Sequence, residues 1–143
     1  MNTRKIRYGS HDYQRCLDLR SSILRAPLGM ELSEADVAGE HEQLHVGIFQ
    51  NQQLMGCITA KTIDDNRLAN IRQMVIAAEA RGKGFGCRLI RDTESILRES
   101  GFIEVELNAR EAAISFYEKQ GYRCVGDFFE KLGIPHIKMY KKF

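Results

Sequence analysis

The stretch Arg81-Gly-Lys-Gly-Phe-Gly86 lies between a segment typical of a strand and a segment typical of a helix. Alternating glycines let backbone N–H groups turn toward a ligand and let that ligand approach closely. The N-terminal end of the following helix adds a partial positive charge. From Ala80 to Arg91 the chain carries four basic side chains and no acidic one. The stretch therefore predicts a phosphate-binding loop, with a merely flexible loop or a solvated basic helix face as the alternatives.

Two common phosphate-binding motifs do not fit this loop. A Walker loop is excluded because Lys83 is followed by Gly84 rather than by Ser or Thr. A dinucleotide motif is excluded because Phe85 and Cys87 occupy the positions where its third glycine would stand. The pattern that remains is Arg-x-x-Gly-x-Gly, which begins at Arg81.

The hydrophobic patterns on either side of the loop predict alternating strands and helices. Period-two alternation and turn residues indicate strands at about 4–8, 44–49, 54–60, 68–77, 103–107, 122–129 and 136–140. Helical spacing and capping residues indicate helices at about 10–26, 33–41, 85–100 and 110–120. The last of these is expected to bury Ala112, Ala113, Phe116 and Tyr117, and the last two strands are joined through Gly133 and Pro135.

These elements predict an α/β fold. Short turns, including one at Asp64-Asp65-Asn66, join the middle strands into antiparallel hairpins. A helix connects the strand at 68–77 to the strand at 103–107, and such a crossover makes the two strands parallel neighbours. We therefore expect a mixed, mostly antiparallel sheet of about seven strands with one parallel step, flanked by about four helices.

The composition is that of one folded domain spanning residues 1–143, with 43% hydrophobic and 28% charged residues. No apolar run approaches the roughly 18–20 residues of a membrane span, and the first residues lack the apolar core of a signal peptide. We therefore expect a cytoplasmic protein with no membrane partner. A net charge of +2 argues against a general nucleic-acid binder, and the four cysteines form no Cys-x-x-Cys pair, which argues against a bound metal.

Two motifs at a suitable separation carry a family resemblance. The first is the loop from Arg81 to Gly86, and the second is the segment from Asn108 to Tyr122 with its Phe-Tyr pair at Tyr117. With these motifs the chain resembles the GNAT superfamily of acyl-CoA-dependent N-acetyltransferases. The likeness follows the element order over most of the chain and is sharpest from residue 74 to 122. The ending at 130–137 is similar to the ElaA-like members.

The resemblance implies acetyl-CoA as the co-substrate, with its pyrophosphate on the glycine loop. It also implies a bulge in the preceding strand, whose freed N–H groups bind pantetheine and polarise the acetyl carbonyl. Pantetheine would lie where the two parallel strands splay apart. The residues expected at the cofactor are Met74, Val75, Ile76, Arg81, Gly82, Lys83, Gly84, Phe85, Gly86, Asn108 and Ser115.

The same resemblance implies catalytic candidates. Tyr117 would donate a proton to the departing CoA thiolate, although it could instead simply pack on the core. Since an acceptor amine must be neutral to attack, a general base or a relay through water usually helps, and His136 is our first candidate for the base. The remaining candidates for the acceptor side are Glu40, His45 and Glu130, which we assign to substrate binding, followed by His41 and Glu106.

We therefore expect an enzyme that moves an acetyl group to a primary amine by direct attack in a ternary complex, without a metal. A small-molecule amine is favoured over a protein, and a homodimer is compatible with the family. A non-catalytic CoA-binding sensory module on the same fold is the main alternative, and it would need no proton donor. A nucleotide- or RNA-phosphate-binding domain fits less well, because the net charge is low and the basic loop lacks a series of interleaved aromatic residues.

Overall fold

The computed structural model describes residues 1–63 and 67–143, so the turn predicted at Asp64-Asp65-Asn66 lies outside the described residues. The strands are β1 (Asn2–Lys5), β2 (Leu44–Gln50), β3 (Gln53–Ile63), β4 (Leu68–Ile76), β5 (Glu104–Arg110), β6 (Arg123–Lys131) and β7 (Ile134–Lys142). The α-helices are α1 (His11–Arg20), α2 (Glu34–Val37), α3 (Phe85–Glu99) and α4 (Ile114–Lys119). A π-helical turn at Ser21–Arg25 and short 3-10 turns at Ala26–Leu28, Glu40–Glu42, Ala78–Ala80 and Glu111–Ala113 complete the described elements.

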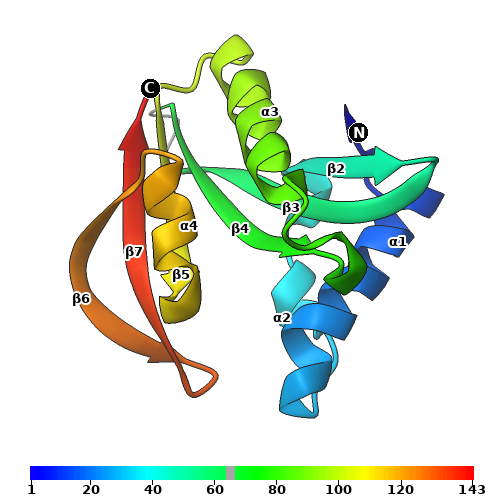
Figure 1. Cartoon of the computed structure of the whole chain (residues 1–143), viewed down its shortest axis with the longest axis horizontal. Helices are drawn as coiled ribbons and strands as arrows, with labels where there is room; N and C mark the ends of the chain where they lie inside the picture. Colours follow the sequence, from blue (N-terminus) through cyan, green and yellow to red (C-terminus); the bar gives the residue numbers. More distant parts are fainter. Residues whose placement is uncertain (64–66) are drawn as a thin grey trace.

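The sheet has the strand order β1-β2-β3-β4-β5-β7-β6 (Figure 1). The β4–β5 pair is parallel, and the other pairs in the described residues are antiparallel. This arrangement confirms the predicted mixed sheet with its one parallel step. The crossover from β4 to β5 runs through α3, as the hydrophobic pattern indicated.

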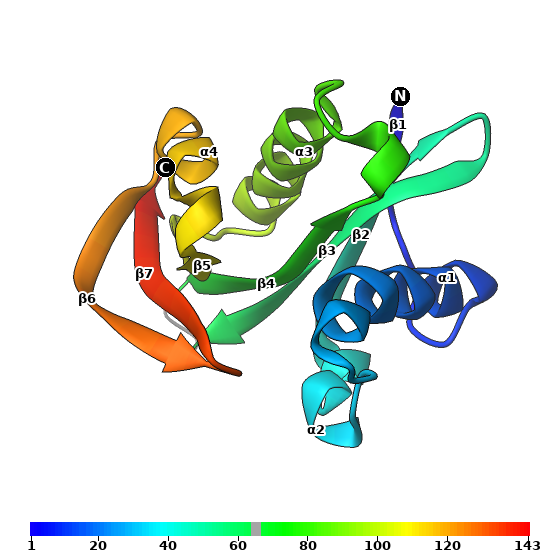
Figure 2. The same cartoon turned by 60° about the horizontal axis from the view of Figure 1, so that its bottom comes forward.

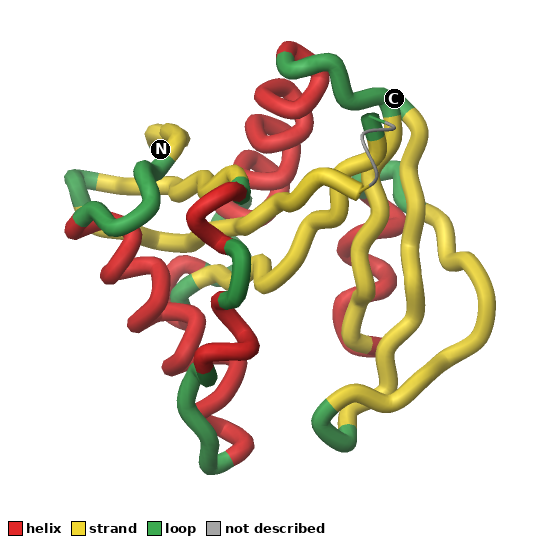
Figure 3. Tube along the Cα trace, turned by 180° about the vertical axis from the view of Figure 1, so that it is seen from behind, coloured by secondary structure: helices red, strands yellow, loops and turns green. Residues whose placement is uncertain are grey.

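The parallel pairing is short. It runs from Leu68 opposite Glu104 to Ile71 opposite Leu107, and it stops there although both strands continue. The two halves of the sheet diverge beyond this point (Figure 3). The structure thus confirms the expected splay.

Helices cover both faces of the sheet (Figure 2). On one face α1 packs through Tyr13 and Cys16 onto Phe49, Cys57 and Val75. On the other face α3 lies across the central strands, and α4 lies over β5 and β6. The central strands of the sheet therefore lie between two apolar layers.

Helix α3 begins at the glycine loop and buries one apolar stripe. Phe85, Leu89, Ile90 and Leu97 are each at most 4% exposed. Fully burying such a side chain contributes about 1.5–3 kcal/mol, so the stripe anchors the loop that precedes it. At 15 residues α3 is the longest α-helix of the described ranges, and none of the helices there is long and apolar enough to cross a bilayer.

Several predicted boundaries shift. The first strand ends at Lys5, although the buried Ile6 still donates its N–H to the His45 carbonyl at 2.8 Å. The 110–120 segment begins with a 3-10 turn, and the prediction that Ala112 is buried is wrong because its side chain is exposed. The last hairpin turns through two residues, Leu132 and Gly133, both with positive φ, so Pro135 belongs to β7 rather than to the turn.

Candidate active site

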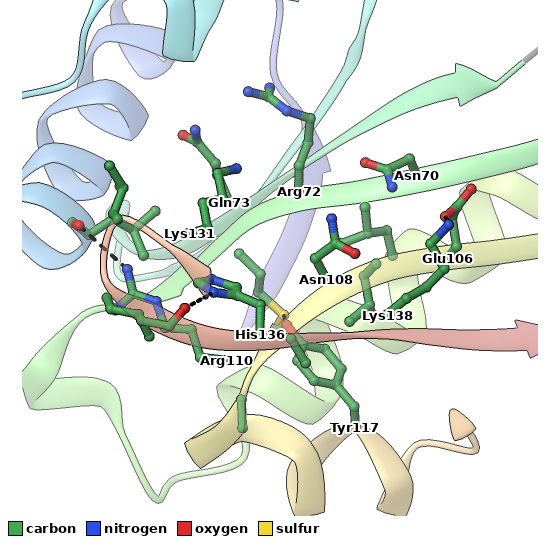
Figure 4. Close-up of a pocket in the computed structure, with 18 of the residues that line it drawn as sticks. Asn70, Arg72, Gln73, Glu106, Asn108, Arg110, Tyr117, Lys131, His136 and Lys138 are labelled. Carbon is green, nitrogen blue, oxygen red and sulfur yellow. Dashed lines mark hydrogen bonds and ion pairs between the residues drawn. The ribbon is translucent and has the colours of Figure 1, made fainter. Parts of the chain in front are cut away.

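A cavity of about 430 Å³ opens where β4 and β5 separate. Its wall comes from both halves of the sheet, from α4 and from the π-helical turn after α1. The polar side chains around it, labelled in Figure 4, are Asn70, Arg72, Gln73, Glu106, Asn108, Arg110, Tyr117, Lys131, His136 and Lys138. Five residues named as candidates from the sequence meet on this wall: Met74, Glu106, Asn108, Tyr117 and His136.

Tyr117 reaches the cavity from α4. Its ring packs edge-on against Phe116 and Tyr122, with ring centroids 5.2 and 5.8 Å away. Its hydroxyl donates only a weak hydrogen bond, to the Met74 Sδ at 3.6 Å. Burial raises the pKa of Tyr117 to about 12, so the phenol is protonated at neutral pH. The residue is therefore part of the aromatic packing, and its protonated hydroxyl has no strong hydrogen-bond partner among the described residues.

His136 reaches the cavity from β7 and is 8% exposed. Its Nδ1 lies 2.7 Å from the Ile134 carbonyl oxygen, which can only accept, so this nitrogen carries the proton. The ring also stacks on Phe129, with centroids 5.9 Å apart. In the neutral imidazole Nε2 then keeps its lone pair and can accept a proton.

A bulge interrupts β4 beside the cavity. The pairing with β3 shifts by one residue between Arg72 and Val75, and Gln73 adopts a left-handed φ of 52°. A bulge leaves one residue outside the ladder and re-aims its neighbours. Because β4 has lost β5 as a partner beyond Ile71, its free edge can offer backbone groups from Met74 to Ile76 to a ligand.

The glycine loop adopts conformations that only glycine takes easily. Gly82 and Gly84 have φ of 73° and 85°, and Gly84 is the N-cap residue of α3. A Cβ at Gly82 would meet nothing within 4 Å, so the loop is open to an approaching group. Residues 81–84 are exposed, whereas the Phe85 side chain is buried, so Phe85 has only backbone to offer a ligand.

Gly86 has a different reason to be glycine. A Cβ there would lie 3.3 Å from the ring of Phe116, so the position permits α3 to pack closely on α4.

The basic side chains of the loop are also less available to a ligand than the sequence suggested. Arg88 pairs with Asp92 at 2.7 Å, and the Arg81 Nε donates to the Ile76 carbonyl at 3.4 Å. Ser115 is exposed and lies outside the residues that line the cavity.

Glu40, predicted to bind the substrate, is fully buried at 0% exposure and does not line the cavity. Its carboxylate accepts hydrogen bonds from Tyr13 at 2.6 Å, from Arg20 at 2.5 and 2.9 Å, and from Arg72 at 2.7 Å. These partners outweigh the cost of burial and lower the pKa of Glu40 to about 2. The carboxylate is thus a satisfied structural anion, which argues against the predicted substrate contact.

His45 and Glu130, the other two residues assigned to substrate binding, also lie outside the cavity wall, whereas the further candidate Glu106 is part of it. His45 is 3% exposed, and its ring nitrogens bond to the Thr59 hydroxyl at 3.1 Å and the Glu40 carbonyl at 2.8 Å. Burial lowers the pKa of His45, so the ring is neutral and enclosed. Glu130 lies on the exposed edge strand β6, beside the cavity-lining Lys131 but outside the wall itself.

Sequence reasoning missed Arg110, Arg72, Lys131 and Lys138 as cavity residues. For Arg110 a signal was present, because Glu106, Asn108 and Arg110 follow at a spacing of two and share one face of β5. Three polar residues on one face of a strand whose other face is buried indicate that the polar face lines a solvent-accessible site. No local pattern revealed the others, because they arrive from different strands.

Comparisons with known proteins agree with this geometry. The chain matches the family described as an acetyltransferase (GNAT) domain over residues 28–143. It is 28% identical over 130 residues to the Bacillus subtilis protein named uncharacterised N-acetyltransferase YitI, covering 87% of each chain. In structure it resembles Escherichia coli ElaA, with a TM-score of 0.84 at 20% identity and 99% of each chain covered. It also resembles an aminoglycoside 6'-N-acetyltransferase solved with coenzyme A, with a TM-score of 0.82 at 18% identity over 99% of this chain and 97% of that one.

Proposed function

Because this chain belongs to the GNAT family of acetyltransferases, we propose that it moves an acetyl group from acetyl-CoA to a primary amine by direct attack of the amine. The observation that carries the proposal is the separation of β4 from β5, which opens one cavity to Tyr117 and His136 together. An acid and a base on one wall suit a transfer that must take a proton from the amine and give one to the thiolate.

Acetyl-CoA would supply the thioester-activated acetyl group, and the chain has suitable places for it. Gly82 and Gly84 in positive-φ conformations, at the N-terminus of α3, suit the pyrophosphate. The free edge of β4 from Met74 to Ile76 suits pantetheine, and Asn108 faces it from β5. The backbone N–H groups of this edge would also stabilise negative charge on the acetyl oxygen.

The two side chains have complementary roles in the proposal. An alkyl ammonium has a pKa of about 10.4, so the Nε2 of His136 would accept its proton before attack. The phenol of Tyr117, held protonated by burial, would donate to the thiolate that leaves. A small-molecule acceptor is favoured over a protein, because a cavity of about 430 Å³ suits a small ligand.

Thiol release from acetyl-CoA, measured against amino acids, amino sugars, simple alkylamines and a lysine peptide, tests the proposal. In Tyr117→Phe we expect kcat to fall roughly 100-fold with CoA affinity unchanged, because only a weakly bonded hydroxyl is removed. In Gly84→Val we expect CoA affinity to be lost, since valine is strained at a φ of 85°.

The outcomes separate the enzyme from its rival. CoA binding without turnover on any amine would support the non-catalytic sensory module instead. If Gly84→Val binds CoA like the natural chain, the pyrophosphate does not lie on this loop. If the natural chain binds no CoA at all, the proposal fails.

A further inference from the structure

The wall of the cavity is strongly cationic. Its basic side chains are Arg25, Lys61, Arg72, Arg110, Lys131 and Lys138, and the only carboxylate on the wall among the described residues is Glu106. A transfer site for an amine does not need this charge, because positive walls repel an ammonium. This excess of positive charge therefore indicates that the acceptor has a further chemical group besides its amine.

Ion pairs account for three of the cations. Arg25 pairs with Asp36 at 2.9 Å, and Lys138 pairs with Glu106 at 3.1 Å. Arg72 pairs with Glu40 at 2.7 Å, although that carboxylate also binds Arg20 and is thus shared between two guanidinium groups.

Arg110 has no such partner. No ion pair links it to a carboxylate within residues 1–63 or 67–143, and it is half-buried. Of its several N–H donors, only Nη2 makes a hydrogen bond to the part of the chain that the structure describes, a long one of 3.5 Å to the Leu24 carbonyl, which also accepts from Arg25 at 3.2 Å. Burial and then the charge of Arg25 lower the pKa of Arg110. A guanidinium taken partly out of water without an anion is costly, so its donors are available to a ligand.

The position of Arg110 relates it to the proposed base. Arg110 of β5 lies directly opposite His136 of β7 in the antiparallel ladder. Directly opposed residues project from the same face, with Cβ atoms about 4.5–5.5 Å apart. Both side chains line the cavity, and Figure 4 shows them next to each other. A small ligand whose anionic group binds Arg110 therefore has the rest of its atoms close to His136.

We propose that the acceptor is a small primary amine that also carries a carboxylate or a phosphate, and that Arg110 binds this anion while His136 faces the amine. The inference rests on the proposed function, whose acceptor it narrows. Guanidinium groups bind both anions through paired N–H donors, which is the chemistry they share. The closeness of Arg110 and His136 favours molecules in which few bonds separate the amine from the anion.

Matched amines test the proposal on the natural chain. β-Alanine is compared with β-alaninamide for the carboxylate, and 2-aminoethyl phosphate with ethanolamine for the phosphate. We expect kcat/KM at least about 10-fold higher for an anionic member than for its neutral partner, as a charged hydrogen bond provides. The pair with the larger ratio identifies the anion. Equal values in both pairs would overturn the proposal and leave the acetyltransferase activity itself intact.

Variants then assign the effect to one side chain. In Arg110→Gln we expect KM for the preferred anionic amine to rise about 10- to 100-fold, with KM for acetyl-CoA unchanged and the preference over the neutral partner lost. Arg110→Lys, which keeps the charge, should recover part of this loss. Arg7→Gln removes an exposed arginine outside the site and serves as the control. An unchanged anion preference in Arg110→Gln contradicts the assignment.

Calorimetry provides a readout that does not depend on turnover. Binding of β-alanine and of 2-aminoethyl phosphate is measured on the CoA-loaded chain and on CoA-loaded Arg110→Gln. Binding of either anion that is lost in the variant supports the anion site even where no amine is acetylated, which separates this inference from the proposed function. Absence of binding by both compounds to the natural chain overturns it.

Discussion

Glu40 and Arg110 are charged side chains, one fully buried and the other half-buried, and they differ in how many hydrogen-bond partners the chain gives them. Glu40 accepts four hydrogen bonds from three side chains and is closed to solvent. Arg110 makes one long hydrogen bond to a carbonyl and opens on the cavity. A charge with all its partners inside the chain contributes to the fold, whereas a charge without one is suited to a ligand. Arg72 belongs to both regions, since it binds Glu40 and also lines the cavity.

The largest effect is expected from breaking the closed network, which is the Glu40 carboxylate with its partners Tyr13, Arg20 and Arg72. In Glu40→Gln two guanidinium groups lose their anion while remaining buried or half-buried. We expect the free energy of unfolding to fall by about 3–5 kcal/mol, as when one partner of a buried ion pair is removed. Urea denaturation followed by circular dichroism measures it.

Arg110→Gln is the matched control for the same measurement. Because Arg110 has no carboxylate partner in the described residues, we expect its removal to change the free energy of unfolding by less than about 1 kcal/mol. A loss in Arg110→Gln as large as that in Glu40→Gln would abolish the distinction between the two regions.

Acid should weaken the closed network next. The pKa of Glu40 in the folded chain is about 2, below its ordinary value of 4.5. A lowered pKa contributes stability that is present above pH 4.5 and is lost as pH falls toward 2. The contribution is about 3 kcal/mol, since each pKa unit corresponds to about 1.4 kcal/mol.

The stability difference between the natural chain and Glu40→Gln isolates this contribution from that of other carboxylates. We expect the difference to shrink over that pH range, because a protonated Glu40 resembles glutamine in charge. Urea midpoints at a series of pH values follow it. A difference that stays constant down to pH 2 would mean that Glu40 is not held ionised by Arg20 and Arg72.

Much of the fold was predictable because its signals are local. Alternation, capping residues and turns mark the elements, and the helix between β4 and β5 requires their parallel pairing. The position of the glycine loop at the start of α3 and the convergence of Tyr117 with Asn108 on one cavity also follow from motifs. The environment of Glu40 was not predictable, because its partners Arg20 and Arg72 lie 20 and 32 residues away on other elements. Whether a buried charge finds its hydrogen-bond partners depends on contacts that form only in the assembled fold.

The smallest effect separates two neighbours at the edge of the cavity. Successive residues of a strand project to opposite faces, and Lys131 lines the cavity whereas Glu130 does not. In Lys131→Gln we expect KM for the preferred anionic amine to rise about 2- to 5-fold, because an exposed ammonium attracts an anion weakly through solvent. Glu130→Gln should leave KM within about twofold and the free energy of unfolding within about 0.5 kcal/mol.

Steady-state kinetics at low and high salt measure the two KM values, and the increase in KM caused by Lys131→Gln should become smaller as salt screens the charge. A larger effect at Glu130 than at Lys131 would restore the sequence prediction for Glu130 and move the acceptor to the other face of β6.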